Sequence, residues 1–218
     1  MLLGKERDQV ADTARGLAAA GLVSGTNGNI SVRAGELVAV SPTGCRLAEL
    51  VADDVAVVDL DGVQHDGALA PTSEIALHLG VYTRYDGGAV IHTHAPMATA
   101  LSCVLDEVPL VHYEMLGLGG AVRVAPYATF GTPELAAGVL DALDGRLAAL
   151  MANHGALTWG PDMATALRAT ELLEWACTLY WRAAQLGAPR TLDDAAARAV
   201  IDHVTSTGYG ATRAAEEE

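Results

Sequence analysis

The sequence predicts an α/β fold, a three-layer α/β/α sandwich around a central, mostly antiparallel mixed sheet. Three β-type runs, at 30–33, 37–41 and 55–60, follow one another through connections too short for a crossover, so these strands must pair largely antiparallel. Strands and helices alternate farther along the chain. The segment 163–186 is a long helical pattern that is apolar on nearly all faces, which favours burial under a sheet or at a subunit contact.

The first part of the chain reads as a helix followed by hairpins. Apolar residues recur at helical spacing within 5–22, which predicts one buried helix face. The Ser-, Gly- and Asn-rich segment 24–29 is a tight loop. The short connection 34–36 and the Asp-Gly pair at 61–62 are hairpin turns.

In the later part of the chain, the expected helix starts carry one of two signals. Thr72 or Ser73 and Thr132 are hydroxyl residues at an N-cap position, and Pro96 is a proline in the first turn. The expected helices are 72–85, one opened by Pro96, one up to 143, 163–186 ending at Gly187, and one near 192–204; the expected strands are 89–94, 122–125, 147–151 and 156–159. We expect residues 1–210 to form a single domain and the acidic segment 211–218 to be frayed.

The composition excludes several classes of protein. The chain has 218 residues, of which 51% are apolar and 18% charged, and a net charge of −14, which argues against a nucleic-acid partner. Every apolar run is interrupted before it could span a membrane, and the charged start shows no signal peptide. The cysteines are odd in number and widely spaced: Cys45, Cys103 and Cys177. This pattern argues against a disulfide framework and favours a reduced, cytoplasmic protein in which each cysteine is a small core residue.

The strongest chemical signal is His92-Thr93-His94. Residues i and i+2 of a strand project to the same face, so two imidazoles could hold one metal ion. His154, between two β-type runs, is the third candidate ligand. Alternatively the pair is two polar residues at a strand end, and the other histidines are surface or core residues: His65, His78, His112 and His203.

Three short segments have the composition of an anion site. Thr72 and Ser73 place two hydroxyls at a helix start, where unpaired N–H groups and the helix dipole favour an anion. Segments 25–29 and 41–44 are rich in glycine, hydroxyls and amides, like loops that wrap a phosphate. Taken singly, each segment is also explained as an ordinary cap or turn. Glu74 either matches the helix dipole or acts as a general base near a metal-bound substrate.

In order and spacing, these segments together resemble the class II aldolase/adducin superfamily, and within it most closely the L-fuculose-1-phosphate aldolase branch. The resemblance runs from the first helix to Tyr209 and rests on Gly25-Thr-Asn-Gly-Asn-Ile-Ser-Val, Ser41-Pro-Thr-Gly, Pro71-Thr-Ser-Glu, His92-Thr-His, Ala125-Pro-Tyr-Ala-Thr-Phe-Gly-Thr and Asn153-His-Gly. Two departures are Thr72, where that branch has serine, and Asn153, where a second histidine can precede the ligand.

The resemblance implies a role for each matching residue. His92, His94 and His154 would bind the metal ion, with Glu74 completing the shell in the free enzyme and acting as acid/base once substrate displaces it. Tyr113 would donate a proton from a neighbouring subunit's side of the site. The phosphate contacts would be Gly28, Asn29, Thr43, Gly44, Thr72 and Ser73, and the aldehyde pocket would include Phe130 and Tyr209.

The implied activity is that of a zinc-dependent aldolase, with Mn²⁺ or Co²⁺ as other ions that imidazoles accept. It would cleave a ketose 1-phosphate (L-fuculose 1-phosphate or a related pentulose or deoxypentulose phosphate) to dihydroxyacetone phosphate and a short aldehyde, through a metal-stabilised enediolate. The implied assembly is a homotetramer with sites at subunit contacts, which would also cover the apolar excess.

Related activities of the same scaffold stay open. They are a methylthioribulose-phosphate-type dehydratase, a sugar-phosphate 4-epimerase and a metal-dependent decarboxylase. Glu74 favours the aldolase over the epimerase, whose equivalent acid is usually aspartate, and the phosphate loops disfavour the decarboxylase. A non-catalytic, adducin-like module would be expected to have lost histidines, and all three are present.

Overall fold

The computed structural model describes residues 1–208 and contains one nine-stranded sheet within that part of the chain, in the order β4-β3-β2-β1-β5-β9-β8-β7-β6. Every neighbouring pair is antiparallel except β7 and β8, which are parallel. The mixed, mostly antiparallel sheet is therefore confirmed. The strands are β1 (Asn29–Ala34), β2 (Leu37–Val40), β3 (Ala56–Asp59), β4 (Gln64–Asp66), β5 (Ala89–Thr93), β6 (Glu107–Val108), β7 (Val122–Ala125), β8 (Ala148–Met151) and β9 (Gly155–Gly160).

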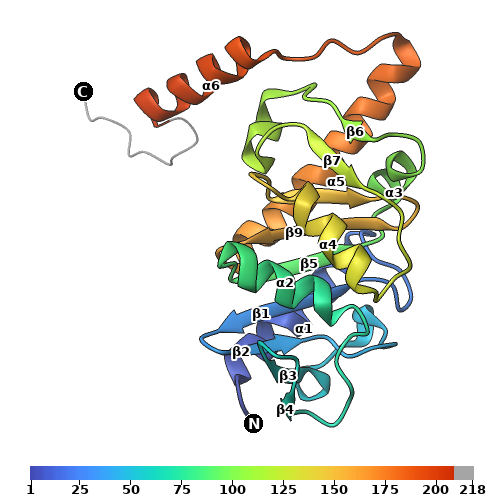
Figure 1. Ribbon diagram of the computed structural model, residues 1–218, viewed down its shortest axis with the longest axis vertical. Coiled ribbons are helices and arrows are strands. Elements are labelled where there is room, and N and C mark those ends of the chain that lie inside the picture. The colour runs from blue at the N-terminus through green and yellow to red at the C-terminus, as the bar shows by residue number, and fades with distance from the viewer. Residues whose placement is uncertain (209–218) are drawn as a thin grey trace.

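Helices cover both faces of this sheet, which confirms the three-layer sandwich (Figure 1). One core lies between the sheet and helices α1, α3 and α5, and the other between the sheet and helices α2 and α4. The helices are α1 (Gly4–Ala19), α2 (Ile75–Tyr85), α3 (Pro96–Ser102), α4 (Pro133–Ala142), α5 (Met163–Leu186) and α6 (Asp194–Thr207), with short 3₁₀ turns η1 (Leu47–Glu49), η2 (Ala52–Asp54) and η3 (Tyr113–Leu118).

Several predicted boundaries were wrong. The first helix ends at Ala19 rather than residue 22, because Gly21 adopts a positive φ of 73° and turns the chain away. The last helix, expected near 192–204, is present over Asp194–Thr207, and the Asp193 side chain caps its start by accepting a hydrogen bond from Ala196 N. Strands β4 and β6 were missed because three and two residues are too few for a period-two pattern.

Helix α5 is expected to be buried under the sheet or at a subunit contact, and this chain buries it on the side of the sheet. Its buried residues fall along the face toward the sheet, whereas Trp175 and Trp181 are 43% and 44% exposed. Helix α6 has no buried residue and stands away from the sheet at one end of the molecule (Figure 1). Both helices therefore present apolar surface that this chain does not cover itself.

The absence of a membrane span and the state of the cysteines are two further expectations from the sequence. Within residues 1–208, no helix combines the length and the apolar character needed to cross a membrane. The three cysteines are unpaired, and Cys177 is buried as expected, but Cys103 is exposed, so the core assignment was wrong for Cys103.

Candidate active site

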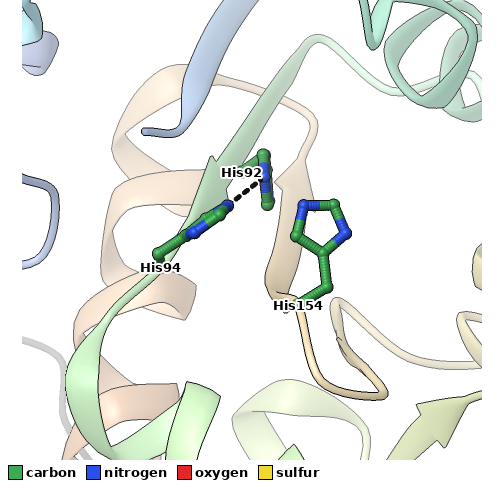
Figure 2. A group of neighbouring side chains, drawn as sticks. All are labelled: His92, His94 and His154. Carbon is green, nitrogen blue, oxygen red and sulfur yellow. Dashed lines mark hydrogen bonds between the residues drawn. The ribbon is translucent and has the colours of Figure 1, made fainter. Parts of the chain in front are cut away.

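Strand β5 ends in the paired histidines. His92 is the fourth residue of the strand and His94 follows its last residue, so both side chains emerge on the same side. Their Nε2 atoms lie 3.1 Å apart. Figure 2 shows the two imidazoles turned toward each other, with His154 facing them from a neighbouring loop. The ring centroids of the three histidines are 4.9 to 5.0 Å apart.

His154 reaches this group through the sheet pairing. It lies in the tight turn between β8 and β9, where Asn153 adopts a left-handed φ of 56° and His154 N donates to Met151 O. Strand β9 also pairs with β5, with Ala156 opposite Thr93. The turn before β9 is thereby held against the end of β5, and the three predicted ligands converge.

The positions of the rings and the pKa values of His94 and His154 suit cation binding. His92 Nδ1 donates to the Ala156 carbonyl at 2.8 Å, which turns its Nε2 toward His94 and Glu74. Burial, followed by the nearby His92 and His154, lowers the pKa of His94 to about 4. Burial, followed by His92, also lowers the pKa of His154. Both rings are therefore neutral at neutral pH, which metal binding requires.

Glu74 completes the group. Its Oε2 lies 3.3 Å from His92 Nε2 and its Oε1 lies 3.5 Å from His154 Nε2. Burial raises the pKa of Glu74, but the hydrogen bond and charge of His92 and the amide of Asn29 outweigh burial and lower the pKa to about 2. Oε1 is buried without a hydrogen-bond partner among the described residues, which is costly unless a cation or donor meets it.

The expected N-cap at Thr72 or Ser73 is wrong. Helix α2 begins at Ile75, and Glu74 occupies the N-cap position without a side-chain capping bond. The Thr72 hydroxyl instead accepts from Glu74 N at 3.2 Å and so forms a turn before the helix. Glu74 is thereby freed from capping and its carboxylate points at the histidines.

This donor set fits a divalent metal ion. Three imidazole nitrogens lie within 4.8 Å of one another, and a carboxylate with an unpaired oxygen adjoins them. Tetrahedral coordination of zinc with bonds of 2.0 to 2.1 Å places ligand atoms about 3.3 Å apart, close to the 3.1 Å between the His92 and His94 nitrogens.

A cavity of about 350 Å³ opens over His94, His154 and Glu74. Ten of the predicted site residues line it: Gly28, Asn29, Thr43, Gly44, Thr72, Ser73, Glu74, His94, Phe130 and His154. Three further lining residues, Thr26, Asn27 and Pro42, were not predicted, although they lie inside or next to the motifs already noted. The predicted anion segments and the predicted metal ligands thus share one cavity.

Backbone hydrogen bonds join the loops of this cavity. Pro42 and Pro71 form an isolated β-bridge, Thr43 N donates to Ala70 O, and Thr72 N donates to Ser41 O. Because these N–H groups are used internally, an anion would be met mainly by hydroxyls and by other backbone N–H groups of the loops. Among the described residues that line the cavity, none is Lys or Arg. The net charge of −14 therefore gives no guide to the ligand, since local neutral donors form this pocket.

Gly28 allows the first loop to lie against β5. Its φ is +88°, and a Cβ atom there would come within 2.7 Å of the His92 carbonyl oxygen. Only glycine combines that conformation with so close an approach. The next residue, Asn29, consequently pairs with His92 across the strands.

Other predicted residues lie elsewhere. His92 is fully buried beneath the cavity, while Tyr113 lines a separate cavity with residues of α6. Tyr209 and segment 211–218 lie outside the described residues. His78, assigned at the sequence level to the core or surface, is fully buried next to Asn29, one helical turn after Glu74. Its i, i+4 spacing from Glu74 was the sequence signal that could have placed it on the same helix side as that carboxylate.

Comparison with known proteins agrees with this geometry. The model of the class II aldolase and adducin N-terminal domain matches residues 8–181. The chain is 36% identical over 197 residues to the 5-deoxy-D-ribulose 1-phosphate aldolase of Bacillus thuringiensis serovar kurstaki, covering 89% of this chain and 92% of that protein. It is 38% identical over 188 residues to the 5-methylthioribulose-1-phosphate/5-deoxyribulose-1-phosphate aldolase of Rhodospirillum rubrum, covering 85% of each.

A solved structure of an L-fuculose 1-phosphate aldolase superposes with a TM-score of 0.88 at 33% identity, covering 92% of this chain and 96% of the other. Sequence and fold therefore agree along most of the chain. The protein belongs to the class II aldolase and adducin family.

Proposed function

We propose that this protein is a metal-dependent aldolase that cleaves a ketose 1-phosphate to dihydroxyacetone phosphate and a short aldehyde. The observation that carries the proposal is the single cavity in which a three-histidine group and a buried carboxylate adjoin hydroxyl- and glycine-bearing loops. Relatives named as aldolases of phosphorylated pentuloses and fuculose support the same chemistry.

The metal would be held by His92, His94 and His154, with Glu74 as a further ligand in the free enzyme. We propose Zn²⁺, and imidazole ligands also accept Mn²⁺ or Co²⁺. When bound, such an ion supplies Lewis-acid stabilisation of negative charge on the oxygens of the substrate.

The phosphate would be bound at the other side of the cavity by Gly28, Asn29, Thr43, Gly44, Thr72 and Ser73. The exposed Thr43 and Ser73 contribute hydroxyls at the cavity wall. The Thr72 hydroxyl accepts from Glu74 N, so its own proton can point to an anion. A phosphate held here would set the distance between the sugar carbons and Glu74.

Proton transfer would use two groups. In the condensation direction, the ionised Glu74 would take a proton from the carbon of dihydroxyacetone phosphate that becomes the third carbon, which gives a three-carbon enediolate, and Tyr113 would donate a proton to the aldehyde oxygen as the bond between the third and fourth carbons forms. Cleavage is the reverse: the deprotonated Tyr113 takes back the proton of the hydroxyl on the fourth carbon while that bond breaks and the aldehyde leaves, and Glu74 returns its proton to the third carbon, which completes dihydroxyacetone phosphate. Tyr113 lies outside this chain's cavity, which fits a role toward the site of an adjoining subunit. Phe130 and Tyr209 would shape the aldehyde pocket.

Among ketose 1-phosphates, we propose a 5-deoxypentulose 1-phosphate as the first substrate to test. The two relatives named for deoxyribulose phosphate match 89% and 85% of this chain. L-Fuculose 1-phosphate is the second, supported by the structural neighbour.

We also propose a homotetramer. The exposed Trp175 and Trp181 of α5 and the separate α6 support subunit contacts, since this chain leaves their apolar side chains open to solvent. Light scattering coupled to size exclusion measures the assembly directly, and a monomer would contradict it.

A coupled assay tests the reaction. Metal-loaded enzyme is offered 5-deoxyribulose 1-phosphate, 5-methylthioribulose 1-phosphate and L-fuculose 1-phosphate, and dihydroxyacetone phosphate is followed through NADH oxidation by glycerol-phosphate dehydrogenase. We expect release of the triose phosphate and of aldehyde in equal amounts. Consumption of a substrate without triose phosphate would indicate dehydration or epimerisation instead. No turnover of any of them would refute the proposed reaction.

A further inference from the structure

A continuous row of buried polar side chains leads from Glu74 into the core between α2 and β1. Glu74 Oε2 lies 2.9 Å from Asn29 Nδ2, and Asn29 Oδ1 lies 2.6 Å from His78 Nε2. His78 Nδ1 lies 2.6 Å from Ser31 Oγ, which lies 2.5 Å from the Tyr82 hydroxyl. None of these five residues is more than 8% exposed. We call this row the Glu74–Tyr82 relay.

The relay follows from the periods of the two elements that form it. Glu74, His78 and Tyr82 are spaced i, i+4, i+8, so they lie along one side of α2 and the turn before it. Asn29 and Ser31 are spaced i, i+2 on β1 and share one face of that strand. Side chains from helix and strand therefore alternate along the row.

Each donor in the relay is set by its neighbour. The ionised Glu74 carboxylate only accepts, so the Asn29 amide presents its NH₂ to it and its carbonyl oxygen to His78. That oxygen also only accepts, so His78 carries its proton on Nε2. Burial, followed by the nearby His92, lowers the pKa of His78 to about 3, which keeps the ring neutral with Nδ1 as an acceptor.

The last two hydrogen bonds then have one direction. Ser31 must donate to His78 Nδ1, and its oxygen accepts from the Tyr82 hydroxyl. Burial raises the pKa of Tyr82, so that hydroxyl keeps its proton. All four hydrogen bonds consequently point toward Glu74, and reversing any one of them would oppose two lone pairs or two protons.

We propose that His78, supported by Ser31 and Tyr82, is a positioning residue that holds the Asn29 amide with its NH₂ group toward Glu74. Without a donor at Asn29 Oδ1, the amide can turn over and present its oxygen to the carboxylate. The carboxylate would then lose a hydrogen bond at Oε2 and move from its place between His92 and His154. Apolar residues could fill the same space, so the polar row serves orientation rather than packing.

The inference rests on the proposed function, in which Glu74 exchanges a proton with the substrate, but part of its test does not. His78→Phe fills the space without a donor, and His78→Gln restores an amide donor near the position of Nε2. We expect His78→Phe to lower kcat about 10- to 100-fold, the usual effect of losing such a supporting partner, with a smaller change in KM because Asn29 is the only proposed phosphate contact that His78 touches. His78→Gln should recover part of that loss.

Titration of each variant with Zn²⁺ by calorimetry is the readout that needs no substrate. We expect weaker Zn²⁺ binding for His78→Phe than for the wild type, with His78→Gln intermediate. If the wild type cleaves no ketose phosphate, the proposed reaction fails while this comparison still decides the relay. A folded His78→Phe variant with wild-type kcat and wild-type Zn²⁺ affinity would overturn the proposal.

Nitrogen NMR of the histidine side chains keeps the test decisive if His78→Phe does not fold. In the wild type we expect His78 to be a neutral ring protonated on Nε2. Ser31→Ala removes the donor to Nδ1, so the Asn29 amide can turn over together with a change of the His78 tautomer, and we expect a mixture of tautomers and a lower kcat in that variant. A wild-type His78 protonated on Nδ1 would contradict the relay, as would an unchanged tautomer and kcat in Ser31→Ala.

Discussion

Replacing Gly155 by alanine should weaken metal binding by about tenfold or more while the protein stays folded. Gly155 begins β9 directly after His154, opposite the end of β5. A Cβ atom there would lie 2.4 Å from the Thr93 carbonyl oxygen, 3.2 Å from His94 Cδ2 and 3.3 Å from His92 Cε1. The new methyl group would therefore press on the strand that carries His92 and His94 and on both of their rings.

The size of the displacement follows from these distances. Cβ contacts shorter than 3.0 Å essentially never occur, so β5 or β9 must move by about 0.6 Å to accommodate the 2.4 Å contact. Metal–ligand distances tolerate only about 0.2 Å. Overpacking of this kind costs about 1 to 3 kcal/mol of stability, which a domain of this size usually survives.

Gly160→Ala is the matched control at the other end of β9. Its Cβ atom would lie 2.8 Å from Ala166 N and from the Thr165 side chain, far from the histidines along the strand. We expect both variants to lose comparable stability in urea unfolding, and only Gly155→Ala to lose Zn²⁺ affinity by about tenfold or more in calorimetry. A stable Gly155→Ala variant with wild-type affinity would refute the geometric argument.

Four further outcomes are expected. Glu74→Gln should keep the fold but lower kcat by about 100-fold or more, because a proton-transfer group is lost, and unchanged turnover would remove Glu74 from that role. Dialysis against a chelator should abolish cleavage and Zn²⁺, Mn²⁺ or Co²⁺ should restore it; activity that persists in protein shown by mass spectrometry to be metal-free would contradict the metal site. Phe130→Ala should change the free energy of unfolding by less than about 0.5 kcal/mol, because the ring is 67% exposed. The same variant should alter the preference among aldehydes in the condensation direction, and an unchanged preference would exclude Phe130 from the aldehyde pocket. Burial holds the pKa of His78 at about 3, whereas the value in the unfolded chain is about 6.5. Between these two values the unfolded chain binds more protons, so the free energy of unfolding falls as the pH decreases below about 6.5. In urea titrations His78→Gln should remove up to about 1.4 kcal/mol per pH unit of that decline, and an unchanged pH dependence of the unfolding free energy would contradict the buried neutral ring.

The sequence by itself determined features that depend on local spacing. Connection lengths predicted antiparallel hairpins, and the period of two predicted that His92 and His94 share a face. Family motifs predicted ten of the residues that line the cavity. These features are predictable because steric limits on short connections and on side-chain direction act within a few residues.

Tertiary packing decided how the distant groups meet. His154 reaches His92 because β9 pairs with both β5 and β8, and Glu74 faces the histidines because α2 begins one residue after it rather than at Thr72. The contact between Asn29 and His78 joins a strand and a helix 49 residues apart. Such contacts depend on how layers pack and on which buried polar groups must find partners, and no pattern within a short window of sequence contains that information.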